Sequence, residues 1–120
     1  MRTEKFKVIE FIRQLLIMID KELENFPKKE IELKNRIKTN SFYILELSYE
    51  ANSIEDVKTK IQILQKVLAK IKVIDFLLNL SLDKEMITSK KYLKLANKID
   101  DITKYTVAWV NSMTGSKNHI

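Results

Sequence analysis

The sequence predicts an all-α protein, an up-down-up-down antiparallel four-helix bundle that forms oligomers. Its 120 residues include a single proline, Pro27, and a single glycine, Gly115. A strand-rich domain of this length would need turn residues about every 8–12 positions, and these are absent. Long helices joined by short polar links therefore account for the chain, and helices joined in this way pack antiparallel to their sequence neighbours.

The first two helices are predicted over residues 3–25 and 27–52. Thr3 can cap the first helix, and Pro27 suits the first turn of the second, where its missing N–H is not needed. Apolar residues of the first helix cover about half of its circumference, more than the ~100° stripe of a helix packed in a monomer. The second helix has a narrower core stripe that includes two polar residues, Asn40 and Ser48. Its apolar members are Leu33, Ile37, Ile44, Leu47 and Ala51.

The third helix is predicted over residues 53–82, with Ser53 as its N-cap. The fourth begins after Thr88 or Ser89, either of which can cap it, and ends at about Met113. Each has one apolar stripe at helical spacing. The stripes are Val57, Ile61, Leu64, Leu68, Ile71 and Leu78 in the third helix, and Leu95, Ala96, Ile99, Ile102, Thr106, Trp109 and Val110 in the fourth.

The composition fits one domain, a four-helix bundle over residues 1–113 followed by a flexible C-terminal tail over residues 114–120. With 45% apolar and 32% charged residues, the chain is of neither the disordered nor the membrane-spanning class. Its longest apolar run, Leu15 to Ile19, is far too short to cross a bilayer. The lack of cysteine and of a signal-peptide pattern favours a cytoplasmic protein.

No residue pattern indicates catalysis, a metal site or a cofactor site. The only histidine, His119, lies in the predicted tail, and the sequence has no cysteine and no glycine-rich phosphate loop. Di-iron bundles take Glu-x-x-His pairs from facing helices, and no interior histidine supplies one. We therefore expect a protein without enzymatic activity, metal or cofactor.

The net charge of +6 is concentrated toward the C-terminal half, where residues 53–84 carry +2 and residues 85–120 carry +3. Lysines on the third and fourth helices can contact the phosphates of a nucleic acid whatever its base sequence. A tyrosine in line with the lysines of the fourth helix can stack on an unpaired base. The alternative is that the lysines only keep the helices soluble. The candidate nucleic-acid-binding residues are Lys58, Lys66, Lys70, Lys72, Lys91, Lys94, Lys98 and Tyr105.

Apolar residues in excess of one core predict self-association, because large exposed apolar patches mark protein contacts. Scattered surface hydrophobes, which are common, are the alternative. The candidate oligomer interface comprises Phe11, Leu15 and Met18 on the first helix and Ile31, Phe42, Leu45 and Tyr49 on the second.

Four stretches over residues 26–110 carry a family resemblance through their order and spacing. They are Phe26-Pro27-Lys28-Lys29-Glu30 with Arg36-Ile37, Ile44-Leu45-Glu46-Leu47 with Glu50-Ala51-Asn52, Phe76-Leu77-Leu78 with Met86-Ile87-Thr88-Ser89-Lys90-Lys91-Tyr92, and Ile99-Asp100-Asp101-Ile102 with Trp109-Val110. With this set the chain resembles Avd, the accessory variability determinant of diversity-generating retroelements, a family related to the proteins of bacterial 23S rRNA intervening sequences. The latter usually continue the second helix as SIPxNIAEG, and the different residues from Ser41 to Leu47 favour the Avd branch.

The resemblance implies a basic four-helix bundle that assembles as a homopentamer. It also implies two partners, the element's reverse transcriptase and its template RNA or another single-stranded nucleic acid, in support of mutagenic reverse transcription. Asp75 and Asn79 stand where arginines often flank the Phe-Leu-Leu motif, and Val107-Ala108 stands where two glycines usually precede the tryptophan. The lysines that are candidates to replace the arginines are Lys66, Lys70 and Lys72.

Two alternatives remain open from the sequence. One is a bundle of the 23S rRNA intervening-sequence type with an unknown partner. The other is a protein-interaction module without nucleic-acid binding.

Overall fold

The computed structural model describes residues 3–115, and this part of the chain contains four α-helices and no strand. The helices are α1 (Thr3–Leu23), α2 (Ile31–Ser53), α3 (Val57–Asp83) and α4 (Ser89–Thr114), and a short 3-10 helix, η1 (Lys28–Glu30), precedes α2. The predicted all-α fold with four helices is confirmed.

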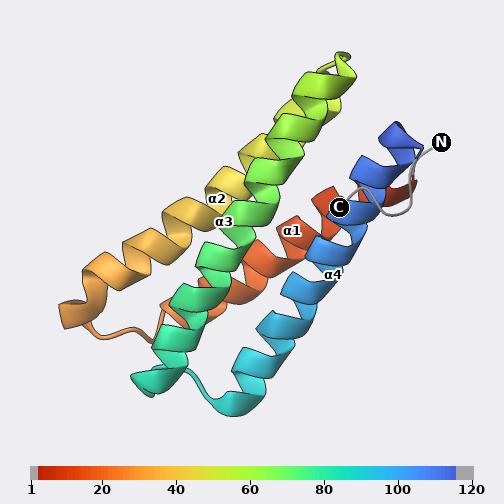
Figure 1. The fold of residues 1–120 in the computed structure, drawn as a ribbon. Helices are drawn as coiled ribbons and strands as arrows, with labels where there is room; N and C mark the ends of the chain where they lie inside the picture. Colours follow the sequence, from red (N-terminus) through yellow and green to blue (C-terminus); the bar gives the residue numbers. More distant parts are fainter. Residues whose placement is uncertain (1–2, 116–120) are drawn as a thin grey trace.

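The helices form a single elongated body of 46 × 23 × 19 Å. α1 packs against α2 and α4, and α3 packs against the same two helices, so that α1 and α3 lie diagonally opposite each other (Figure 1). The α2–α3 contact is the most extensive of the four and the α1–α2 contact the least. This arrangement gives every helix one face toward a shared interior and one face outward.

All four helices contribute to one apolar core, in which Trp109 is the largest fully buried side chain. The predicted stripe of α2 is buried except for the half-buried Asn40, and that of α4 is buried except for the half-buried Ala96. The stripe predicted for α3 is partly wrong, because Val57 is about half exposed while Ile63 and Ile74 are buried. Since α3 contacts α2 more extensively than α4, its buried face is turned toward α2.

Leu15 belongs to this core and not to an outer surface. It is 0% exposed, so its assignment to an oligomer interface is wrong, whereas Leu16, at one edge of the apolar arc of α1, is half-buried. The sequence shows that this arc is wider than one core needs. It does not show which part of the arc faces inward, and in the structure the middle of the arc is buried.

The four buried polar side chains each donate a hydrogen bond within their own helix. Every hydroxyl is bonded to the carbonyl oxygen four residues earlier, at 2.6 to 2.9 Å: Ser41 to Ile37, Ser48 to Ile44, Ser81 to Leu77 and Thr106 to Ile102. A buried hydroxyl without a partner would cost about 1–3 kcal/mol. These small side chains therefore enter the core without leaving a polar group unsatisfied.

The helix ends correct one of the expected caps and leave another outside the description. Ser53 is not the N-cap of α3 but the last residue of α2, where its hydroxyl donates to the Glu50 carbonyl oxygen at 2.9 Å. The cap of α3 is Asp56, whose Oδ2 accepts from the hydroxyl and the backbone N–H of Thr59 at 2.6 and 2.9 Å. These bonds lower the pKa of the Asp56 carboxyl. The side chain of Thr3, the expected cap of α1, is not among those described.

The fourth helix begins as predicted at the Thr88 cap, whose Oγ1 accepts from the Lys91 backbone N–H at 3.2 Å. It ends one residue later than predicted, at Thr114, and Gly115 closes it with a left-handed φ of 70°, a conformation that glycine adopts without steric cost. Residues 116–120, including His119, lie outside the described part of the chain.

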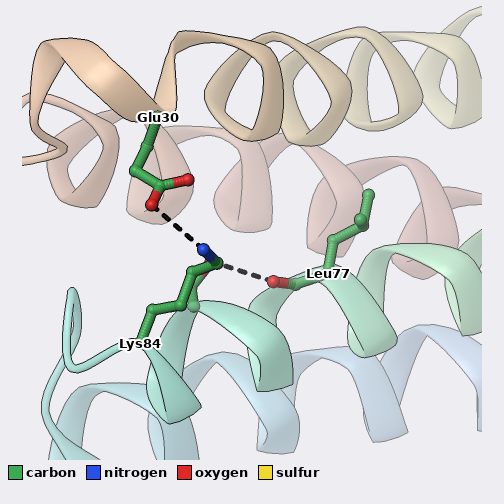
Figure 2. Close-up of polar contacts among 4 residues, drawn as sticks. Glu30, Leu77 and Lys84 are labelled. Carbon is green, nitrogen blue, oxygen red and sulfur yellow. Dashed lines mark hydrogen bonds and ion pairs between the residues drawn. The ribbon is translucent and has the colours of Figure 1, made fainter.

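An ion pair joins two links at the end of the bundle where α2 begins. Lys84, in the link between α3 and α4, places its Nζ 3.0 Å from Oε2 of Glu30 in η1 (Figure 2). The same view includes the Leu77 carbonyl that accepts from Ser81. The pair therefore connects segments that are 54 residues apart in sequence.

The burial of Leu15 gives a stability prediction. Leu15→Ala should lower the free energy of unfolding by about 2–5 kcal/mol, because it leaves a cavity in the core. The control Leu93→Ala changes a residue of α4 that is 59% exposed and should change this free energy by less than about 0.5 kcal/mol. Urea unfolding followed by circular dichroism measures both values, and equal effects would contradict the placement of Leu15.

Candidate nucleic-acid interface

The lysines of α3 form a basic surface that contains no acidic residue over most of the helix. Between Val57 and Ile74 this helix carries five lysines and no acidic residue. Lys58, Lys66 and Lys72 are exposed and Lys70 is half-buried. Among residues 3–115, none of these four forms an ion pair with a carboxylate, so their charges are available to an external anion.

Lys70 marks the edge of this surface that borders α2. Its Nζ lies 5.6 Å from the centroid of the Tyr43 ring of α2, a cation–π distance. The contact holds a long, flexible side chain at the boundary between α2 and α3.

The row predicted on α4 lies along α1 instead of facing freely outward. Lys91 Nζ is 3.5 Å from Glu22 Oε1, and Lys98 Nζ donates to Gln14 Oε1 at 2.6 Å. Of the three lysines of the row, Lys94 is exposed without a described contact of this kind. Two charges of the row are therefore engaged within the chain.

Tyr105 and Lys98 share one aromatic partner on α1. The rings of Tyr105 and Phe11 meet edge to face with their centroids 5.5 Å apart, and Lys98 Nζ lies 4.6 Å from the centroid of Phe11. All three side chains are half-buried. The structure thus brings three predicted functional residues together in a contact between α1 and α4.

The departures from the Avd pattern on α3 serve the contact with α4. The Tyr92 hydroxyl donates to Asp75 Oδ1 at 3.0 Å and accepts from Asn79 Nδ2 at 3.2 Å. Burial is the main cause of a raised Tyr92 pKa, and the Asp75 carboxylate adds to it. Asp75 and Asn79 therefore hydrogen-bond to α4 through Tyr92.

The predicted apolar surface residues fall into two groups. On α2, Ile31, Phe42 and Tyr49 are each about half exposed, and Leu45 is half-buried against the core. Phe42 borders a groove of about 500 Å³ between α1 and α2. On α1, Phe11 and Met18 are half-buried and pack against the core.

Six exposed apolar or aromatic side chains of the described residues were missed by the sequence reasoning. They are Phe6, Ile17, Tyr43, Val73, Phe76 and Leu93. A 100° step per residue places Phe76 opposite the face of α3 that is buried in the structure, but only to one side of the stripe predicted from the sequence. Phe76 was considered only as part of the Phe-Leu-Leu motif.

Within residues 3–115, no group of three or more histidine, cysteine, aspartate or glutamate side chains is arranged to hold a metal ion. None of the helices in the same range has the length and apolarity needed to cross a membrane. No family model, curated protein or solved structure matches the chain.

The contacts of Lys98 distinguish it from its neighbour Lys94. Lys98→Ala should lower the free energy of unfolding by about 1 kcal/mol, because it removes the bond to Gln14 and the cation above Phe11. Lys94→Ala removes the same charge from an exposed position and should have almost no effect. Thermal unfolding of both variants measures the difference, and equal stabilities would show that the Lys98 contacts contribute nothing to the fold.

Proposed function

We propose that this chain is a non-enzymatic accessory protein of a diversity-generating retroelement. In this proposal it is a basic homo-oligomer, a pentamer of up-down-up-down bundles, that binds template RNA and the element's reverse transcriptase and supports mutagenic reverse transcription. The two partners, the reverse transcriptase and the template RNA, are proposed because of the resemblance to the Avd family. The observation that carries the nucleic-acid part is the acid-free lysine surface of α3.

The dimensions of this surface suit a polyanion. From Lys58 to Lys72 the helix rises by about 21 Å, so several phosphates of one strand fit along it. Lysine is a flexible point charge that binds phosphate regardless of sequence. In a homo-oligomer the surface is repeated, and weak contacts of single subunits add up to tight binding.

The separation of the two surfaces supports an oligomer that binds nucleic acid. Six of the ten exposed large apolar side chains in the described part of the chain lie on α1 and α2, whereas the lysine surface lies on α3, diagonally opposite α1 (Figure 1). Subunits that associate through the groove between α1 and α2 leave the outward face of α3 uncovered. Self-association and RNA binding are therefore compatible in one subunit.

The exposed apolar side chains of α1 and α2 also suit a second candidate, a protein-interaction module without nucleic-acid binding. Salt separates the two, because phosphate contacts weaken steeply with salt and apolar contacts do not. A neighbouring reverse transcriptase gene with a repeat pair would separate the retroelement function from that of an rRNA intervening-sequence type protein.

The lysine surface gives a quantitative test. Lys66→Gln combined with Lys72→Gln should weaken binding to single-stranded RNA and reduce the slope of log affinity against log salt by about 1.4, since each lost phosphate contact contributes about 0.7. The matched control, Lys28→Gln with Lys29→Gln, removes the same charge from exposed lysines in η1 and should leave the slope nearly unchanged. Fluorescence anisotropy over a salt series gives the slopes, and equal slopes for both pairs would refute a site on α3.

The apolar surface gives a second test, of assembly. Light scattering should give a mass several times that of the 14.2 kDa chain, with five subunits expected. Phe42→Glu should give smaller species of unchanged helix content, because it places a charge in the apolar groove. The control Leu93→Glu changes an exposed residue of α4 and should preserve the mass. A monomeric wild type would contradict the oligomer.

A further inference from the structure

We infer that the outward face of α3 binds unpaired bases by aromatic stacking, so that it prefers single-stranded RNA to duplex. The inference rests on the proposed function and concerns the same lysine surface. Its new element is Phe76, which lies at the C-terminal end of this surface and which no core or interhelical contact explains.

Phe76 is 63% exposed, although it stands in the interior of a 27-residue helix. Ala69, Val73 and Phe76 follow each other at intervals of four and three residues, and therefore lie along one line of the helix. All three are exposed. Together they form an outward apolar strip on the side of α3 that faces away from the core.

Lysines flank this apolar strip on both sides. At 100° per residue, Lys72 falls on one side of it and Lys66 and Lys70 fall on the other. The contact between Lys70 and Tyr43 confirms that the second side borders α2. An apolar strip with one lysine on one side and two on the other is complementary to a single strand, whose bases present π-faces and whose phosphates are anionic.

The same geometry disfavours duplex at Phe76. In a duplex the base faces are stacked on one another, so an outer aromatic ring reaches only sugar and phosphate. The lysines then contact phosphates of either form, whereas Phe76 contributes to the single-stranded form alone. The two residue types consequently make separable contributions to binding.

The test compares two variants at one position. Phe76→Leu keeps an apolar side chain but removes the π-face, whereas Phe76→Trp keeps the π-face and adds a fluorophore. The probes are a single-stranded oligouridine of about 16 nucleotides, the upper end of common single-strand site sizes, and the same strand annealed to oligoadenosine. The control is Phe6→Leu, because Phe6 is 60% exposed on α1.

Phe76→Leu should weaken oligouridine binding roughly tenfold, within the range for one stacked base, and leave duplex binding unchanged. Phe76→Trp should bind oligouridine as the wild type does, and its fluorescence should be quenched by the single strand but not by the duplex. Trp109 is 1% exposed and supplies a constant background. Phe6→Leu should bind both probes normally.

Three results would overturn the stacking inference. If Phe76→Leu binds oligouridine normally while the Lys66 and Lys72 double variant binds weakly, the lysine surface stands without stacking, and Phe76 suits an apolar protein partner instead. If Phe76→Leu weakens both probes equally, Phe76 acts through the fold or the assembly. If the wild type binds the duplex more tightly than the single strand, the inferred preference for single-stranded RNA is wrong. A wild type that binds neither probe overturns the proposed function itself.

Discussion

The whole structure depends on one apolar core that four helices share. Each helix commits its buried stripe to this interior, and Trp109 of α4 is the largest side chain enclosed there. The buried hydroxyl groups of the core have their hydrogen bonds satisfied, because each donates to a carbonyl oxygen of its own helix. The residues outside the buried stripes determine the charge and polarity of the exposed face of each helix.

Those outward faces differ from one helix to the next. α3 presents lysines around an apolar strip, and α1 and α2 enclose an apolar groove. α4 has part of its polar surface engaged by its neighbours, because Lys91 and Lys98 contact α1 and Tyr92 contacts α3. Its lysines Lys90, Lys94 and Lys104 are exposed, so α4 keeps some of the excess positive charge at its surface.

The number of helices and most of their buried stripes could be predicted from the sequence. The contacts between helices could not. The scarcity of glycine and proline was enough for four helices, and periodicity found the stripe of α2. Leu15 was misplaced because a helical wheel gives the width of an apolar arc and not the direction of its neighbours. Ser53 was misplaced because Asp56, three residues later, is an equally good cap. The contacts of Lys98 with α1 connect residues 84 positions apart, a distance over which no local pattern extends.

The three-residue link between α2 and α3 has a consequence for how the chain folds. Closing so short a loop costs little chain entropy, and the two helices that it joins make the most extensive contact in the molecule. An α2–α3 hairpin is therefore the expected folding nucleus, which φ-values in the two helices would report. α1 and α4 flank this hairpin in sequence and pack on it from either side, so these two helices are expected to become ordered after it.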